Sequence, residues 1–216
     1  MKVGQTLPAG FFDRDSREVA IDLIGCTLLH ETPEGAAGGV IVETEAYREY
    51  DPACHAYNGP TMRNRNLFAR PGVAYVYLSY GIHHLINVVC EREGYGSAVL
   101  VRALRPSLGT DLMARRRGPK VRVKDLTNGP GKLSRALGVD LALDGTDLTK
   151  GPLRLLYGER EEAEGDIVST TRIGITRGAE LPWRYLATGE LDVSVKPLRV
   201  CERGLERLFG KSDSAR

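Results

Sequence analysis

Residues 73–104 read VAYVYLSYGIHHLINVVCEREGYGSAVLVRAL. Three runs in this stretch have the β-branched, aromatic and aliphatic composition that is typical of strands, at residues 73–81, 83–89 and 97–104. The first two runs meet at Gly81, and a glycine-rich turn at residues 94–96 separates the second from the third. Because short turns join antiparallel neighbours, the stretch predicts an antiparallel meander.

The flanking sequence predicts one more long strand and several shorter elements. Residues 38–47, GGVIVETEAY, form a β-branched run bounded by glycines. Apolar spacing and start and stop signals predict helices at 13–24, 108–117, 132–137 and 201–209, and strands at 153–156 and 168–176. Helices and strands do not alternate regularly, which favours the α+β class. We therefore expect a single compact domain at residues 1–205, with a curved, mainly antiparallel sheet flanked by helices, and a polar C-terminal tail at 206–216.

The composition excludes disordered and fibrous proteins. The 216 residues are 42% hydrophobic, and 30 Lys plus Arg against 28 Asp plus Glu give a net charge of +2. The four cysteines lie far apart, with no C-x-x-C pair and no histidine at zinc-ligand spacing, so we expect no metal site. The chain shows no signal-peptide pattern and no uninterrupted apolar stretch of membrane-spanning length. We expect a cytoplasmic protein with reduced thiols, nucleoid-associated if the source is a prokaryote.

Aromatic and basic side chains gather in the middle of the chain. Seven of the nine tyrosines lie at positions 47, 50, 57, 75, 77, 80 and 95. Tyr80 directly precedes Gly81, so a turn there would project the ring outward as a wedge. Six basic residues and no acidic one lie between Asp111 and Asp125. Each feature alone is more typical of packing or of a solvated surface, but the combination favours nucleic acid over an acidic small molecule.

Two further segments offer cationic groups for phosphates. Residues 51–72 are predicted to form a long loop, which contains Arg63, Arg65 and Arg70. Residues 128–133, NGPGKL, open a predicted helix with glycines and Lys132, so their amides could hold a phosphate. For each arginine alone, an ordinary solvated surface is the safer interpretation, and an ordinary helix-entry turn fits residues 128–133 equally well.

Two glutamates on the strand at 38–47 raise a question of reaction chemistry. Strand alternation places Ile41, Glu43, Glu45 and Tyr47 on one face. A carboxylate can act as a general base on water or stabilise positive charge in a transition state. Beside aromatic walls it suits a pocket for a flat, electron-poor ring, and cleavage of a glycosidic bond is one chemistry of this type. Most strand glutamates merely face solvent, and that alternative stays open.

Five segments together closely resemble the alkyladenine (3-methyladenine) DNA glycosylase family. They are IVETEAY at 41–47, DPACHAYNGPTMRNRNLF at 51–68, YVYLSYGIHHLINVV at 75–89, VLVRAL at 99–104 and NGPGKL at 128–133. The resemblance implies a monofunctional enzyme that flips alkylated or deaminated purines out of duplex DNA, hydrolyses the N-glycosidic bond with a Glu-activated water and so initiates base excision repair. The implied substrates are 3-methyladenine, 7-methylguanine, hypoxanthine and etheno-adenine. The family implies no cofactor, double-stranded DNA with damaged purines as the partner, and action as a monomer.

The same resemblance implies a role for each matching residue. Glu45 matches the catalytic carboxylate, and Arg102 matches the arginine that helps to hold the water. The implied base pocket is Tyr47, His55, Tyr77, Asn87 and Leu100, the intercalating residue is Tyr80, and the implied DNA-backbone contacts are Arg63, Arg65 and Lys132. Within the pocket, the His55 amide would read the base edge, and Asn87 would disfavour the exocyclic amine of guanine. His83 departs from the residue expected beside the wedge.

Two other functions fit parts of the same sequence. A non-enzymatic DNA or RNA binder could share the fold and the basic run, with Glu45 as an ordinary surface carboxylate. A hydrolase of free purine nucleosides would need neither the basic run nor the Tyr80 wedge.

Overall fold

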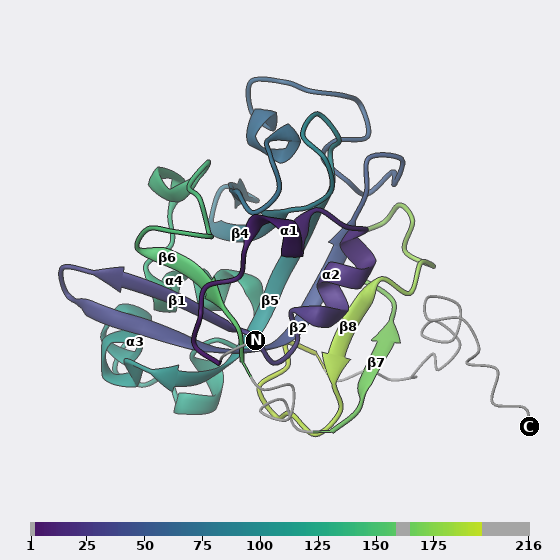
Figure 1. Ribbon diagram of the computed structural model, residues 1–216. Coiled ribbons are helices and arrows are strands. Elements are labelled where there is room, and N and C mark those ends of the chain that lie inside the picture. Colours follow the sequence, from purple (N-terminus) through teal and green to yellow (C-terminus); the bar gives the residue numbers. More distant parts are fainter. Residues whose placement is uncertain (1–2, 159–164, 196–216) are drawn as a thin grey trace, which may run out of the picture.

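The computed structural model describes residues 3–158 and 165–195. Within these ranges, eight strands form one sheet in which all paired strands are antiparallel. The strands are β1 (Thr27–Thr32), β2 (Gly35–Tyr47), β3 (Ala74–Ser79), β4 (His83–Val89), β5 (Ala98–Leu108), β6 (Leu153–Leu156), β7 (Ile167–Thr170) and β8 (Arg184–Ala187). The order is β3-β4-β5-β2-β1-β6; β8 pairs with β2, and β7 pairs with β8 (Figure 1).

Short helices cover this sheet. They are α1 (Ala9–Phe12), α2 (Ser16–Asp22), α3 (Thr110–Arg117), α4 (Pro130–Leu137) and the 3-10 helices η1 (Arg65–Phe68), η2 (Val123–Asp125) and η3 (Leu141–Leu143). The side chain of Asp15 starts α2 by accepting a hydrogen bond from the Arg17 amide at 2.9 Å. Figure 1 shows α2 in front of β2 and β5, and Thr44 of β2 donates to the carbonyl of Ala20 at 2.8 Å. The apolar core lies between these helices and the sheet.

The α+β class and the antiparallel meander of residues 73–104 are confirmed. The strand predicted at 168–176 is wrong beyond Thr170, where β7 ends, and the helix predicted from Leu108 begins later because Leu108 still belongs to β5. Strands β1 and β8 were not predicted; both are short and lack a clear alternating pattern. The helix predicted at 201–209 and the tail at 206–216 lie outside the described residues.

The centre of the sheet is irregular where β2 passes from one neighbour to the next. Residues 35–40 of β2 pair with β1, residues 43–45 pair with β8, and β5 lies along the opposite edge. Against β5, the register skips Val42 on β2 and Arg102 on β5. The pairs around these bulges are Ile41 with Leu104, Glu43 with Ala103 and Thr44 with Val101.

The first bulge corrects one prediction. Ile41 belongs to the main core, whereas Val42 packs in a separate cluster with Ala103 and Leu186. The expected shared face of Ile41 and Glu43 is therefore wrong, because an extra residue between them breaks the two-residue alternation. Bulges of this kind redirect side chains, and here they lie directly beside Glu43 and Arg102.

Candidate active site

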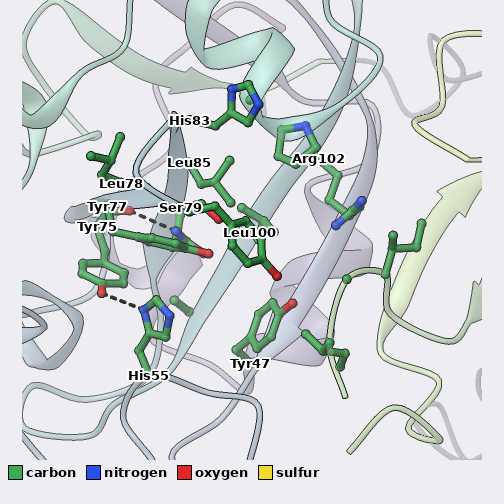
Figure 2. A pocket seen from close by; sticks show the side chains of 18 of the residues that line it. Tyr47, His55, Tyr75, Tyr77, Leu78, Ser79, His83, Leu85, Leu100 and Arg102 are labelled. Carbon is green, nitrogen blue, oxygen red and sulfur yellow. Dashed lines mark hydrogen bonds between the residues drawn. The ribbon is translucent and has the colours of Figure 1, made fainter. Parts of the chain in front are cut away.

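A cavity of about 760 Å³ opens beside the C-terminal half of β2. Its walls come from β2 to β5, the loop at 51–72, the start of α4 and the segment at 173–175. Figure 2 shows Tyr47 on one side and the rings of His55, Tyr75 and Tyr77 on the other, with Leu100 between them. Of the predicted site residues, those that line it are Tyr47, His55, Arg63, Tyr77, Tyr80, Asn87, Leu100, Arg102 and Lys132.

Glu45 lies behind the residues that line this cavity and has no exposed surface. Its Oε2 accepts a hydrogen bond from the Tyr47 hydroxyl at 2.7 Å and lies 3.1 Å from Nη1 of Arg102. Its Oε1 accepts a hydrogen bond from the Ile173 amide at 2.8 Å. Since Tyr47, Arg102 and Ile173 all line the cavity, the carboxylate is held at the cavity wall by three groups that face the cavity.

Glu43 is equally buried but has different partners. Its Oε1 accepts hydrogen bonds from Nε of Arg102 at 2.8 Å, Nε of Arg184 at 2.7 Å and the Ser194 hydroxyl at 2.7 Å. Its Oε2 accepts from the Ser194 amide at 2.5 Å. Arg102 therefore bridges the two carboxylates, and Glu43 fixes the guanidinium that reaches Glu45.

The two environments drive the carboxyl pKa values apart. Burial raises the pKa of Glu45, and the attraction of Arg102 and the hydrogen bonds from Ile173 and Tyr47 do not fully compensate. Burial also acts to raise the pKa of Glu43, but Arg102 and Arg184 outweigh it and hold that pKa below its usual value. A carboxyl with a lowered pKa beside one with a raised pKa is the arrangement by which active sites separate a charge-holding group from a proton-accepting one.

The opposite wall is aromatic and uncharged. The ring centroids of His55 and Tyr77 are 4.5 Å apart, and those of Tyr75 and Tyr77 are 5.5 Å apart. Nδ1 of His55 lies 2.9 Å from the Tyr75 hydroxyl. Burial and the nearby positive charge of Arg63 lower the pKa of His55, which keeps the imidazole neutral near pH 7. A flat ring between Tyr47 and this wall would meet aromatic side chains and a neutral imidazole.

Comparison with known proteins gives the family of this chain. A sequence profile described as "Methylpurine-DNA glycosylase (MPG)" matches residues 10–191. The chain belongs to the methylpurine-DNA glycosylase family. Membership identifies it as an enzyme that hydrolyses N-glycosyl bonds in DNA, which excludes the non-enzymatic binder.

Curated relatives extend this match over nearly the whole chain. A protein of Rubrobacter xylanophilus is 61% identical over 195 residues, which cover 90% of this chain and 100% of the relative. One from Rhodopseudomonas palustris is 52% identical over 194 residues, with 90% and 93% coverage. One from Methanoculleus marisnigri is 50% identical over 191 residues, with 88% and 98% coverage. All three carry the name "Putative 3-methyladenine DNA glycosylase".

In this methylpurine-DNA glycosylase, the floor of the cavity is formed by paired residues of β4 and β5. Asn87 and Leu100 face each other across the two strands and are 5% and 3% exposed. Nδ2 of Asn87 donates to the carbonyl of Tyr75 at 3.1 Å, so the side-chain amide is fixed in one orientation. A purine that enters the cavity meets a rigid amide on this floor.

The predicted wedge, Tyr80, is 86% exposed at the tip of the β3–β4 turn. The Ile82 amide donates to the carbonyl of Ser79 at 3.0 Å, with φ of 50° at Tyr80 and 71° at Gly81. Two positive φ angles are typical of a hairpin turn that prefers Asn-Gly, and a tyrosine in this conformation is strained. Strain at the tip of a turn is a common sign of function.

The predicted DNA-backbone residues are placed unevenly. Arg63 and Lys132 are exposed side chains at the cavity, whereas Arg65 is exposed on η1 and does not line it. Within the basic run, Arg117 also lines the cavity. Arg116, by contrast, is tied to Glu34 at 2.8 Å and serves to join α3 to the β1–β2 turn.

Several site residues were not predicted from the sequence. Ile173 contributes only its backbone amide, which no side-chain pattern could reveal, and Arg184 and Ser194 reach Glu43 from 141 and 151 residues away in the chain. Ile82 is 72% exposed beside the wedge, and an apolar residue directly after a Tyr-Gly turn was a signal that could have been used.

Other chemistries find little support in the part of the chain that the structure describes. No group of three or more His, Cys, Asp and Glu residues in these ranges could hold a metal ion. Burial raises the pKa of the Cys54 thiol to about 12, so this cavity-lining cysteine is a poor nucleophile. Among the described helices, none is long and apolar enough to cross a bilayer.

Proposed function

We propose that this glycosylase flips alkylated and deaminated purines, namely 3-methyladenine, 7-methylguanine, hypoxanthine and etheno-adenine, out of duplex DNA and hydrolyses their N-glycosidic bonds. The observation that carries the proposal is the position of Glu45, which is buried, held by Arg102, Tyr47 and Ile173, and placed at one end of an aromatic cavity. The names of the relatives support 3-methyladenine as one substrate. Abasic DNA is the product, and its formation begins base excision repair.

Tyr80 supplies the group that replaces the flipped nucleotide in the stack. Flipping costs a few kcal/mol of lost stacking and pairing, and the cost is lowest for a damaged or mispaired base. An exposed aromatic ring on a turn can fill the vacated space and offset part of that cost. Arg63 and Lys132, exposed side chains that line the cavity, are the proposed contacts to flanking phosphates.

Tyr47, His55 and Tyr77 then hold the base. Purines alkylated at N3 or N7 are cationic, so stacking on these rings adds a cation–π attraction of about 0.5 to 2 kcal/mol. Neutral lesions such as hypoxanthine lack this attraction and depend on shape and hydrogen bonds. The His55 amide reads the base edge, and the fixed amide of Asn87 disfavours a purine that carries a 2-amino group.

Glu45 acts as the general base on water. The water oxygen attacks C1′ of the deoxyribose and gives a proton to the carboxylate, while the C1′–N bond breaks and its electron pair leaves with the base. The ionised carboxylate also stabilises the oxocarbenium character of the sugar. Arg102 holds the water and Glu45 in place, and Glu43 keeps Arg102 oriented.

The enzyme is proposed to be monofunctional and to act as a monomer. Water is the nucleophile in this scheme, and the lysine at the cavity, Lys132, has its Nζ hydrogen-bonded to Asn128 at 2.8 Å. One chain supplies every element of the proposed site. We expect no protein–DNA adduct on borohydride treatment, and a trapped adduct would overturn the monofunctional assignment.

Incubation of end-labelled duplexes that carry hypoxanthine, etheno-adenine or 7-methylguanine, followed by alkaline cleavage, tests the substrate range. Methylated genomic DNA tests 3-methyladenine by release of the free base. We expect release from lesion duplexes, none from an undamaged duplex and none from free purine nucleosides. Efficient cleavage of free nucleosides would favour the nucleoside hydrolase instead.

A further inference from the structure

A buried ion pair lies beside the cavity residue Tyr47. Arg172 follows β7, and Asp51 begins the loop at 51–72; neither side chain has any exposed surface. Nη1 of Arg172 donates to Oδ2 of Asp51, and Nη2 donates to Oδ1 at 3.0 Å. The pair thus joins two segments that are 121 residues apart in the sequence.

Each partner of this pair also holds part of the cavity. Nη1 of Arg172 donates to the carbonyl of Ala46, the residue between Glu45 and Tyr47, at 3.0 Å. Its guanidinium carbon lies 4.6 Å from the centroid of the Tyr47 ring. The next residue, Ile173, donates its amide to Glu45 at 2.8 Å.

Asp51 extends the same connection to the opposite wall. Its Oδ1 accepts a hydrogen bond from the Ala53 amide at 3.0 Å, two residues before His55. One ion pair therefore fixes the amide on Glu45, the ring of Tyr47 and the start of the loop that carries His55.

Stability alone is a weak reason for such a pair. The cost of removing two charges from water often exceeds their attraction, and apolar residues of similar volume are frequently as stabilising or more so. What an apolar pair could not supply is the forked set of hydrogen bonds to Asp51, Ala46 and the carbonyl of Gly178.

We propose that Arg172 and Asp51 form a positioning pair that holds the Ile173 amide on Glu45 and thereby keeps the general base ionised at working pH. The proposal rests on the general-base role of Glu45 proposed above. The charged and titratable groups that face Glu45 are Glu43 and Tyr47 of β2, Arg102 of β5, Tyr77 of β3 and Arg172 itself. Burial favours the neutral acid, and the amide opposes it.

The substitution Arg172→Lys isolates the geometric part of this effect. Lysine keeps the positive charge but loses the planar fork, so the segment at 172–173 is no longer held in place. The hydrogen bond from the Ile173 amide to the ionised Glu45 is then weaker, and its weakening raises the pKa of Glu45. We expect the acid limb of the single-turnover rate to move to higher pH by about one unit.

A double variant distinguishes the positioning effect from misfolding. Arg172→Met with Asp51→Asn removes the ion pair as a neutral unit, leaves no uncompensated buried charge and retains an acceptor for Ala53. We expect the same direction of shift. Arg116→Lys is the matched control, because it also breaks a forked ion pair, with the exposed Glu34, that touches no cavity residue at its fork.

Single-turnover base release from a hypoxanthine duplex between pH 5 and 9 is the measurement, at a temperature well below the thermal midpoint of each variant. Loss of folded enzyme lowers the amplitude of the profile and leaves its midpoint unchanged. Wild type and Arg116→Lys should share one midpoint, with both Arg172 variants shifted above it. A lower thermal midpoint with an unshifted profile would show that the pair is only structural. An active Glu45→Gln enzyme would instead overturn the general-base proposal on which this inference depends.

Discussion

At the scale of single residues, the central feature is the contrast between two glutamates two positions apart. Glu43 accepts from two arginines and a serine, whereas Glu45 accepts from one tyrosine and one amide and forms an ion pair with the shared arginine. The residue types of this pair were predictable from the sequence, because ETEAY already places two carboxylates and an aromatic ring together. Their different partners were not, since Arg184, Ser194 and Ile173 come from distant segments.

The amide of Asn87 should set which purines are accepted. Asn87→Ala removes the group proposed to oppose a 2-amino substituent, so release of 7-methylguanine should rise relative to hypoxanthine. Changes of one group in a pocket are worth about 1 to 3 kcal/mol, which corresponds to roughly tenfold or more in relative rate. Single-turnover rates on both duplexes measure this ratio. An unchanged ratio would remove Asn87 from discrimination.

At the scale of elements, the site depends on irregularities within regular strands. The bulges beside Glu43 and Arg102 direct both side chains to the same place, and the strained β3–β4 turn presents Tyr80. Composition and alternation predicted β2 to β5 as strands, yet a two-residue period carries no information about where it is interrupted. That is why the strand was predicted correctly, whereas the predicted face of Ile41 was wrong.

Relief of the strain in the turn should separate stability from function. In Tyr80→Gly the positive φ is no longer penalised, and this relief exceeds the entropy that glycine adds to the unfolded chain, so the free energy of unfolding should rise by up to about 1 kcal/mol. The same change removes the wedge, so affinity for a lesion duplex should fall more than affinity for an undamaged one. Thermal unfolding and gel-shift titration on the two duplexes test both halves. Equal losses of affinity on both duplexes would count against the wedge.

At the scale of the whole molecule, a nearly neutral chain presents basic residues around its cavity. Arg63, Arg117 and Lys132 lie at the cavity although the net charge is only +2. The basic run at 115–124 was predicted as a surface from its composition. Within this run, Arg117 lines the cavity and Arg116 has a structural role. This difference depends on the position of α3 and could not be predicted.

The salt dependence of DNA binding should report these contacts. Lys132→Ala removes one proposed phosphate contact, so the slope of log K against log salt should become shallower by about 0.9. Lys150→Ala is a matched control, because Lys150 is 77% exposed and does not line the cavity. Equal slopes for wild type and both variants would exclude Lys132 from phosphate binding.

Protonation of Glu43 should contribute to the unfolding of the protein by acid. A carboxyl whose folded pKa is depressed stabilises the fold above its unfolded value, 4.5, and loses that contribution as the pH falls through the folded pKa. Glu45 has the opposite sign, because its pKa is raised and its ionised form costs stability. At pH 7, Glu43→Gln should therefore lower the thermal midpoint, and Glu45→Gln should leave it equal or higher. A large drop for Glu45→Gln would contradict this assignment of the two environments.

The most direct test of the account is the single-turnover rate of base release by Glu45→Gln, measured beside its affinity for the same lesion duplex. Glutamine keeps the shape and leaves the aromatic walls, Tyr80 and the cationic residues in place, but it cannot accept a proton from water. The account predicts that release is abolished while lesion binding stays close to that of wild type. Base release at the wild-type rate would contradict the assignment of Glu45 as the general base.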